Sequence, residues 1–166
     1  LDEIKGQHNW SISVWHGNHK WHSKSEEFAR NLENYCLKKK IIFYQDSADR
    51  IDVSTEERAR QWRYQKLFEK ASEISKKDKN NLCIITGHTN TDKTETFLLN
   101  LARGSNFAGL GGIPDKRLLN KKFFLVRPMM IFSRNDTASI CKELEIPFWV
   151  DPTNVDTQLK RNLIRH

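Results

Sequence analysis

Short apolar runs alternate along the chain with longer segments whose apolar residues recur at helical spacing. Each short run is bounded by polar residues, glycine or proline, which is typical of β-strands. The predicted strands cover residues 10–15, 41–44, 82–86, 123–126 and 148–150. Because strands that alternate with helices favour parallel pairing, this pattern predicts an α/β fold in which helices flank a parallel sheet.

Helix signals occupy the segments between the predicted strands. A Ser followed three residues later by Glu or Asp predicts a capping box, and a Gly just past a periodic segment predicts a helix end. The predicted helices run from Ser23 and Glu26 to Lys39, onward from Ser54 and Glu57, over 92–103 before Gly104, and from Ser133 and Asp136 to Leu144. The predicted buried stripe of the second helix comprises Ala59, Trp62, Leu67, Phe68 and Ala71. Residues 75–81 and 107–122 are predicted to be connections.

Composition narrows the class of protein. A length of 166 residues suits one domain, and the nine Phe and five Trp help a 37% hydrophobic share to form a core. No apolar run reaches about 18 residues, so no membrane span is expected. The scattered Cys36, Cys83 and Cys141 predict buried thiols in a reducing compartment rather than a disulfide framework.

The charge of the chain favours a polyanionic partner. Its net charge is +7, and residues 116–166 contain ten Lys and Arg against five Asp and Glu. A basic surface suits RNA, because binding to phosphates releases counterions. Composition alone is weak support, since a Lys-, Asn- and Ile-rich sequence also results from an A/T-rich genome.

The most informative stretch follows the predicted strand at 82–86. This strand ends at Gly87, His88 comes next, and Asp92 and Glu95 occupy the first turns of a helix. The carboxyl end of a strand and the start of a helix are where an open α/β sheet binds ligands and phosphate. Alone, the same residues also suit a plain helix start, in which acidic side chains stabilise the N-terminus.

Three histidines, His16, His19 and His22, are spaced three residues apart after the first predicted strand. This spacing raises the question of a metal site. On a loop the spacing is not distinctive, and no adjacent Cys or carboxylate completes a ligand set. The sequence therefore does not favour zinc.

An ordered series of motifs extends over nearly the whole chain. Gly87, His88, Asp92, Glu95 and Thr96 are followed by Arg103-Gly104-Ser105 and Gly109-Leu110. Further motifs are Trp15-His16-Gly17-Asn18-His19-Lys20-Trp21, Ala59-Arg60-Gln61-Trp62-Arg63-Tyr64, Leu125-Val126-Arg127-Pro128, Ser133-Arg134, Trp149-Val150-Asp151-Pro152-Thr153-Asn154 and Arg161-Asn162-Leu163-Ile164-Arg165-His166. In this order they resemble the tRNA(Ile)-lysidine synthetases, a PP-loop family of the N-type ATP-pyrophosphatase superfamily. That family's pattern reads Gly-His-x-x-Asp-Asp-x-x-Glu-Thr, and Thr91 replaces its first Asp here.

The resemblance implies a Rossmann-like, adenine nucleotide alpha hydrolase-like fold and a two-step ligation. ATP, with Mg²⁺, adenylates the C2 oxygen of the wobble cytidine in a tRNA(Ile) with a CAU anticodon. The ε-amine of free lysine then displaces AMP. The product, lysidine, changes the codon that is read from AUG to AUA. The implied partners are this tRNA and lysine, with no membrane, and a homodimer is left open.

The resemblance also assigns roles to residues. The implied catalytic residues are His88, Asp92 and Glu95, with Asp92 also a Mg²⁺ ligand, and the implied nucleotide-binding residues are His16, Gly17, His19, Arg60 and Arg63. The implied tRNA- or lysine-binding residues are Arg103, Gly104, Arg134, Asp151, Asn154, Arg161, Asn162 and Arg165. Without the resemblance, the arginines on the second helix and the polar tail would be interpreted as solvated.

One family motif does not occur. The family opens with a strand and a Ser-Gly-Gly-x-Asp-Ser loop that holds the pyrophosphate of ATP, and no such loop is present. We therefore expect residues 1–166 to be a partial catalytic domain that lacks its first βα unit, has a basic tail from about residue 151, and is inactive alone. A degenerate, non-catalytic RNA-binding remnant and another PP-loop tRNA-modifying enzyme, such as a thiolase, are the alternatives. The absence of a Cys-x-x-Cys pair counts against thiolation.

The motifs at residues 15–21 and 59–64 are most similar to the cyanobacterial and plastid branch of the family. The resemblance therefore implies a plastid stroma or a cyanobacterial cytoplasm as the compartment.

Overall fold

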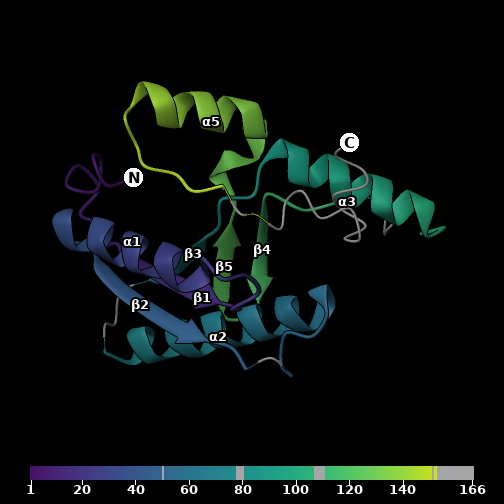
Figure 1. Cartoon of the computed structure of the whole chain (residues 1–166), viewed down its shortest axis with the longest axis horizontal. Helices are drawn as coiled ribbons and strands as arrows, with labels where there is room; N and C mark the ends of the chain where they lie inside the picture. Colours follow the sequence, from purple (N-terminus) through teal and green to yellow (C-terminus); the bar gives the residue numbers. More distant parts are fainter. Residues whose placement is uncertain (50, 78–80, 107–110, 151, 153–166) are drawn as a thin grey trace. The chain divides into compact units, whose positions relative to one another are not determined.

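The structure, a computed structural model, describes residues 1–49, 51–77, 81–106, 111–150 and 152 (Figure 1). The chain divides into two compact units, Leu1–Ser72 and Glu73–His166. Both units contain parallel strands accompanied by helices, which confirms the predicted α/β class. No helix within the described ranges is long and apolar enough to cross a membrane.

The first unit is built on a strand–helix–strand arrangement. Strands β1 (Ser13–Asn18) and β2 (Ile42–Ser47) pair in parallel along their full lengths. Helix α1 (Ser25–Lys38) connects them and packs against both strands. Helix α2 (Glu56–Lys77) follows, and its last residues fall in the second unit. The parallel pairing places the ends of β1 and β2 at one edge of this sheet.

The core of the first unit lies where α2 begins. Ala48, Val53, Ala59 and Trp62 are buried together, and Trp15 of β1 packs against them. Ala71 is also buried, so three members of the predicted stripe are confirmed as core, whereas the other two are half-buried.

The start of α1 differs from the prediction. The helix begins at Ser25 after Lys24, whose side chain makes no cap, so the Ser23–Glu26 capping box is wrong. The physical reason is that the Glu26 carboxylate has another partner: it accepts a hydrogen bond from the buried Asn18 amide at 3.1 Å. Glu26 therefore links α1 to the end of β1.

The start and end of α2 were also predicted imperfectly. Thr55, not Ser54, accepts the early helix amide, with its Oγ1 3.2 Å from the Arg58 nitrogen. The helix continues to Lys77, beyond the predicted start of a loop at residue 75. A Lys77–Glu73 ion pair of 3.0 Å lies in this last turn. Pairs of opposite charge at this spacing add modestly to helix stability.

The second unit contains a mixed sheet. Strands β3 (Cys83–Ile85) and β5 (Phe123–Val126) pair in parallel, and β4 (Lys116–Leu119) pairs with β5 in the antiparallel direction, in the order β3-β5-β4. Helix α3 (Asn90–Ala102) follows β3. The 3₁₀ helix η1 (Pro128–Ile131) and helix α5 (Arg134–Glu143) follow β5. The carboxyl ends of β3 and β5 thus lead into α3 and α5.

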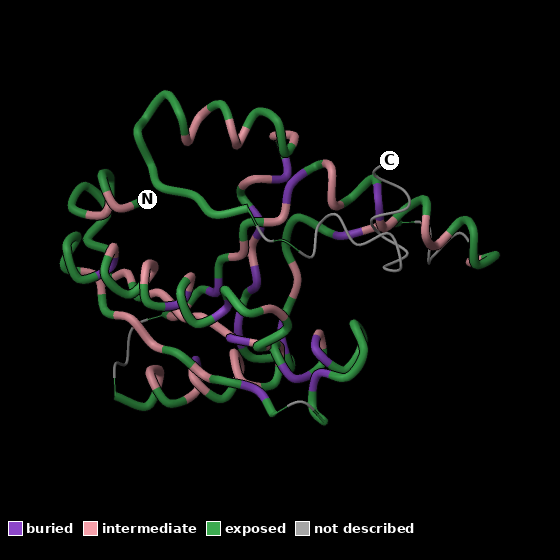
Figure 2. The backbone as a smooth tube through the Cα atoms, viewed as in Figure 1, coloured by how far each residue is buried: buried purple, intermediate pink, exposed green. Residues whose placement is uncertain are grey.

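Alternation of burial along β5 shows which face of this sheet carries the core (Figure 2). Phe123 and Leu125 are buried, while Phe124 between them is exposed. The other buried apolar residues of this unit are Ile84, Ile113, Leu119 and Met130. Leu125 is fully buried, so β5 lies at the centre of the second unit.

Two predictions in the second unit are wrong. Part of the predicted connection at 107–122 is strand β4, joined to β5 by residues 120–122, of which Asn120 and Lys121 have positive φ. Two such residues are typical of a tight hairpin turn. The predicted strand at 148–150 is absent: these residues are exposed and follow Pro147, which has no amide hydrogen for a strand ladder.

The cysteines are less uniform than predicted. Cys36 is buried, Cys141 is half-buried and Cys83 is exposed, so the prediction of buried thiols is right only for Cys36. Desolvation raises the pKa of both the Cys36 and the Cys83 thiols. Neither of these two thiols is therefore poised as a thiolate nucleophile.

Candidate functional site

The start of α3 is organised by Asp92. Its Oδ2 accepts hydrogen bonds from the Thr89 backbone amide at 2.8 Å and from the Thr89 hydroxyl at 2.9 Å. Thr89 is the buried N-cap residue, and the pair forms a capping box. Asp92 therefore has a structural role at this helix start, and only one of its two oxygens is used by the cap.

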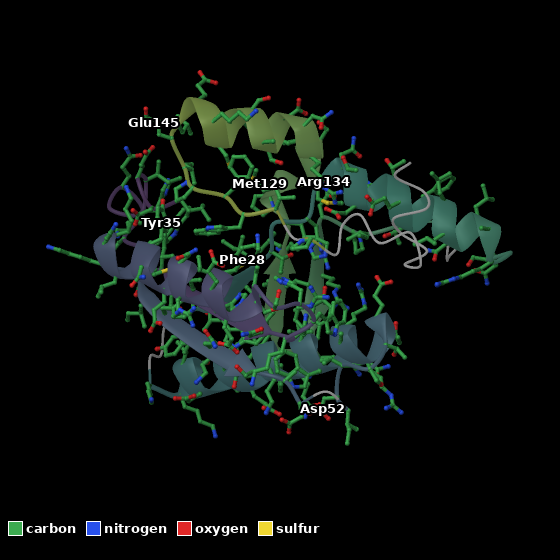
Figure 3. All side chains as sticks on the ribbon, in the orientation of Figure 1. Phe28, Tyr35, Asp52, Met129, Arg134 and Glu145 are labelled. Atoms are coloured by element: carbon green, nitrogen blue, oxygen red, sulfur yellow. The ribbon has the colours of Figure 1, made fainter. Side chains whose placement is uncertain are left out.

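Arg134, the first residue of α5, reaches the two predicted catalytic carboxylates. Its guanidinium lies 3.4 Å from Oδ1 of Asp92 and 3.7 Å from Oε1 of Glu95. Glu95 is only 3% exposed, and a buried carboxylate needs a compensating charge. Figure 3 labels Arg134 at the start of α5, beside the start of α3. We call Asp92, Glu95 and Arg134 the α3 carboxylate cluster.

The His88 ring is held by a neighbour that the sequence did not single out. A hydrogen bond of 2.9 Å joins the Thr86 hydroxyl to Nδ1 of His88. The Thr86 amide donates to the Val126 carbonyl at 3.0 Å, which continues the β3–β5 pairing by one residue. Thr86 is thus fixed by the sheet and in turn orients the imidazole.

Thr91 joins the starts of α3 and α5. Its Oγ1 accepts the Arg134 backbone amide at 3.0 Å, and the Asn90 amide donates to the Phe132 carbonyl at 2.8 Å. These bonds link segments about forty residues apart in the sequence. The sequence indicated Thr91 only as a departure from the family pattern.

Arg103 and Gly104 lie at the opposite end of α3. At a helical rise of 1.5 Å per residue, Arg103 is roughly 17 Å along the helix axis from Asp92. Both residues are exposed, and Gly104 closes the helix with a φ of +69°. The structure therefore does not bring this predicted tRNA- or lysine-binding pair into the α3 carboxylate cluster.

In the first unit, two of the predicted nucleotide-binding residues, Gly17 and His19, lie against aromatic rings. We call Trp15, His19 and Trp62 the β1 aromatic cluster. The Trp15 and Trp62 ring centroids are 6.4 Å apart, and the His19 ring meets Trp62 edge-on at 5.3 Å. A Cβ added to Gly17 would lie 2.6 Å from the Trp15 ring and 3.0 Å from the Trp62 ring. Gly17 is thus required for the close packing of this cluster.

Arg60 and Arg63 lie on α2 on either side of Trp62. The Arg60 guanidinium lies 5.2 Å from the centroid of the Tyr64 ring, a cation–π contact. Arg63 is exposed. These arginines belong to the same compact unit as the β1 aromatic cluster.

The burial of His16 predicts that the stability of the first unit depends on pH. Burial lowers the pKa of His16 from its ordinary 6.5, against the opposing effect of Glu26. In the unfolded chain the ring protonates near 6.5, so the unfolded state binds more protons below that pH. The free energy of unfolding should therefore be highest above pH 6.5 and fall on acidification, by at most about 1.4 kcal/mol per pH unit for one group.

Urea unfolding of the wild type and of His16→Gln between pH 5 and 7.5 measures this effect. The variant should show a shallower loss of stability below pH 6.5. His8→Gln, at an exposed histidine in the same unit, is the matched control and should follow the wild type. Parallel curves for the wild type and His16→Gln would show that His16 does not cause the acid sensitivity.

Among the residues that the structure describes, no three His, Cys, Asp or Glu side chains converge to hold a metal ion alone. The predicted tail residues Asp151, Asn154, Arg161, Asn162 and Arg165 lie outside the described residues. The candidate site residues that the structure describes therefore lie mainly at the start of α3 and near the end of β1.

Known proteins are similar to this chain over nearly its whole length. A family model described as the PP-loop domain matches residues 1–166. A protein named tRNA(Ile)-lysidine synthase from Prochlorococcus marinus MED4 is 52% identical to this chain, over 99% of this chain and 50% of its own length. A protein of the same name from strain NATL1A is 45% identical, over 98% of this chain and 51% of its own length. A chloroplastic protein of that name from Pyropia yezoensis is 34% identical over 99% of this chain and 48% of its own length. The chain thus spans about half the length of these relatives.

Proposed function

Since the chain belongs to the PP-loop domain family, we propose that it is part of an ATP-dependent tRNA(Ile)-lysidine synthase. The observation that carries the proposal is the α3 carboxylate cluster, which stands at the carboxyl end of a strand and the start of a helix. Relatives of that name, similar over nearly all of this chain, support the same conclusion. Both units would then belong to one PP-loop catalytic domain.

The proposed reaction has two steps. The C2 oxygen of the wobble cytidine, in a tRNA(Ile) with a CAU anticodon, attacks the α-phosphate of ATP, and pyrophosphate leaves. The lysine ε-nitrogen then bonds to C2, the C2–oxygen bond breaks, and AMP leaves with that oxygen, while the amine proton passes to a base. The protein chiefly supplies orientation and stabilisation of developing charge.

The start of α3 suits the charges of this reaction. A helix N-terminus and an imidazole ring can stabilise negative charge that develops on a phosphate or on the base oxygen. His88 is oriented for this role by its bond to Thr86. We propose His88, Asp92 and Glu95 as the catalytic residues, with Arg134 beside them.

The donor set fits a Mg²⁺ ion that is shared with ATP. Mg²⁺ is often held by one or two carboxylates together with phosphate and water oxygens. Oδ2 of Asp92 is used by Thr89, while Oδ1 makes a long contact of 3.4 Å with Arg134. We propose that Asp92 supplies this one oxygen to the metal. Bound Mg²⁺ would neutralise the triphosphate.

The remaining assignments extend the proposal to the substrates. His16, Gly17, His19, Arg60 and Arg63 would contact ATP. Gly17 and His19 lie against Trp62, on the helix that also carries both arginines, which supports a shared role. Arg103, Gly104, Arg134, Asp151, Asn154, Arg161, Asn162 and Arg165 would contact the tRNA or lysine. The cyanobacterial and chloroplastic relatives support a cyanobacterial cytoplasm or a plastid stroma as the compartment.

The decisive experiment uses the full-length protein with ATP, radiolabelled lysine and a tRNA(Ile) transcript. We expect ATP-dependent transfer of label to the CAU transcript and none to a transcript with a GAU anticodon. Binding of tRNA without pyrophosphate release would favour the RNA-binding remnant. Sulfur transfer to the tRNA, with no lysine incorporation, would favour a thiolase.

The basic tail leads to a prediction about salt. Replacing Arg161 and Arg165 together by alanine should weaken tRNA binding and flatten its dependence on salt. Each lost phosphate contact should reduce the log–log slope by about 0.7–0.9. Filter binding across a salt series measures both effects. Lys76→Ala with Lys77→Ala removes the same charge from an exposed helix end and should leave the slope unchanged. Equal slopes in the two double variants would mean that the tail arginines do not contact phosphates.

A further inference from the structure

A side-chain acceptor on α3 contributes to the attachment of the start of α5. The Thr91 hydroxyl accepts the amide hydrogen of Arg134, the first residue of α5, at 3.0 Å. The first amides of a helix have no partner inside the helix and need one outside it. Ser133 accepts the Asp136 amide at 3.1 Å, and Thr91 accepts the Arg134 amide. Two different side chains therefore complete this helix start.

The position of that amide determines where the Arg134 side chain begins. The guanidinium then spans Asp92 and Glu95 at 3.4 and 3.7 Å. Its side chain is 44% exposed, so packing does little to hold it. Both carboxylates lie on α3, as Thr91 does. Helix α3 thus carries both carboxylates and also the Thr91 hydroxyl that positions Arg134, their cationic partner.

From this geometry, and resting on the function proposed above, we infer that Thr91 is a positioning residue that acts through Arg134. Its hydroxyl holds the backbone of Arg134 so that the guanidinium reaches both carboxylates of the α3 carboxylate cluster. A second bond, from the Asn90 amide to the Phe132 carbonyl at 2.8 Å, keeps α5 attached when the hydroxyl is removed. Loss of Thr91 should therefore misplace the guanidinium rather than unfold the unit.

Three substitutions at Thr91 test separately whether its hydroxyl acceptor or its branched shape positions Arg134. Thr91→Val keeps the branched shape but removes the acceptor. Thr91→Ser keeps the acceptor and loses only a methyl group. Thr91→Asp restores the family pattern and also keeps an acceptor oxygen. If the acceptor is what matters, only the valine variant should lose the correct placement of Arg134.

Steady-state lysidine formation by the full-length protein provides the first test. In Thr91→Val, kcat/KM should fall about 10-fold, because small misplacements of catalytic groups cost this much or more. Thr91→Ser should stay within about 2-fold of the wild type. The double variant Thr91→Val, Arg134→Gln should be no slower than Arg134→Gln alone, since a residue that acts through another adds nothing once that partner is gone. Thr94→Val, on an exposed turn of the same helix, is the matched control.

A spectroscopic readout separates this inference from the proposed function. The Arg134 Nη–H signals, assigned by their loss in Arg134→Gln, should exchange more slowly with water in the wild type and in Thr91→Ser than in Thr91→Val, because these nitrogens face the two carboxylates. The difference in exchange rate should be several-fold. If this change occurs in a protein that makes no lysidine, the inference stands and the proposed function fails. Unchanged exchange, or additive losses of kcat/KM in the double variant, would overturn the inference.

Discussion

Replacing Asp92 by asparagine is expected to slow ATP-dependent adenylation about 100-fold while leaving the fold intact. Asparagine keeps an oxygen that can accept the Thr89 amide hydrogen in the capping box. It removes the negative charge that faces Arg134 and that would hold Mg²⁺. Pyrophosphate release by the full-length protein with tRNA and ATP measures the rate, and thermal unfolding checks the fold.

The second capping box of the same unit offers a matched control. Asp136 accepts the Ser133 amide at 2.8 Å at the start of α5, in the arrangement that Asp92 forms with Thr89. Asp136→Asn should therefore leave the adenylation rate near that of the wild type. Asp92→Ala should lose both the rate and the capping-box bonds to Thr89, and His88→Ala should also lose about 100-fold in rate. A near-normal adenylation rate in Asp92→Asn would show that Asp92 caps the helix but takes no part in catalysis.

Gly17→Ala is expected to lower the free energy of unfolding of the first unit by about 1–3 kcal/mol. The added methyl carbon would lie 2.6 Å from Trp15 and 3.0 Å from Trp62, so at least one ring must move. Both rings are large and rigid, and Trp15 is also held by a hydrogen bond from its indole nitrogen to Asp46. Urea unfolding followed by tryptophan fluorescence measures the change.

Gly6→Ala is the control for this substitution. It lies in the same unit, and a methyl group there would meet nothing within 4 Å. Its effect should stay within about 0.5 kcal/mol, as is usual for surface changes. If both alanine variants unfold alike, the tight contact at Gly17 is relieved without cost. The glycine would then matter for what binds beside it rather than for packing.

Local signals in the sequence predicted some elements well. The bounds of β5 were correct because a purely apolar run is flanked by Lys122 and followed by Pro128. The start of α5 was correct because its capping box involves only neighbours in sequence. β1 begins and ends three residues later than the predicted strand at 10–15, since its bounds are determined by pairing with β2, from Ser13 opposite Ile42 to Asn18 opposite Ser47. Partners that are distant in sequence thus explain this error.

The same distinction applies to the candidate site. The sequence placed His88, Asp92 and Glu95 together because they lie within eight residues of one another. It grouped Arg134 with tRNA- or lysine-binding residues, whereas the structure puts its guanidinium on carboxylates about forty residues away. Thr91 was noted as a substitution, but its bond to α5 depends on the packing of two helices. No local pattern encodes such a contact.

The distribution of tryptophan determines what fluorescence can report about this protein. Of the five tryptophans, Trp10, Trp15, Trp21 and Trp62 belong to the first unit and only Trp149 to the second. Trp15 and Trp62 are close enough to influence each other's emission, and Trp149 is partly exposed. An unfolding curve recorded by intrinsic emission is therefore mainly a curve for residues 1–72. Events at the start of α3 would go largely unseen by that probe and call for amide hydrogen exchange, which resolves individual segments.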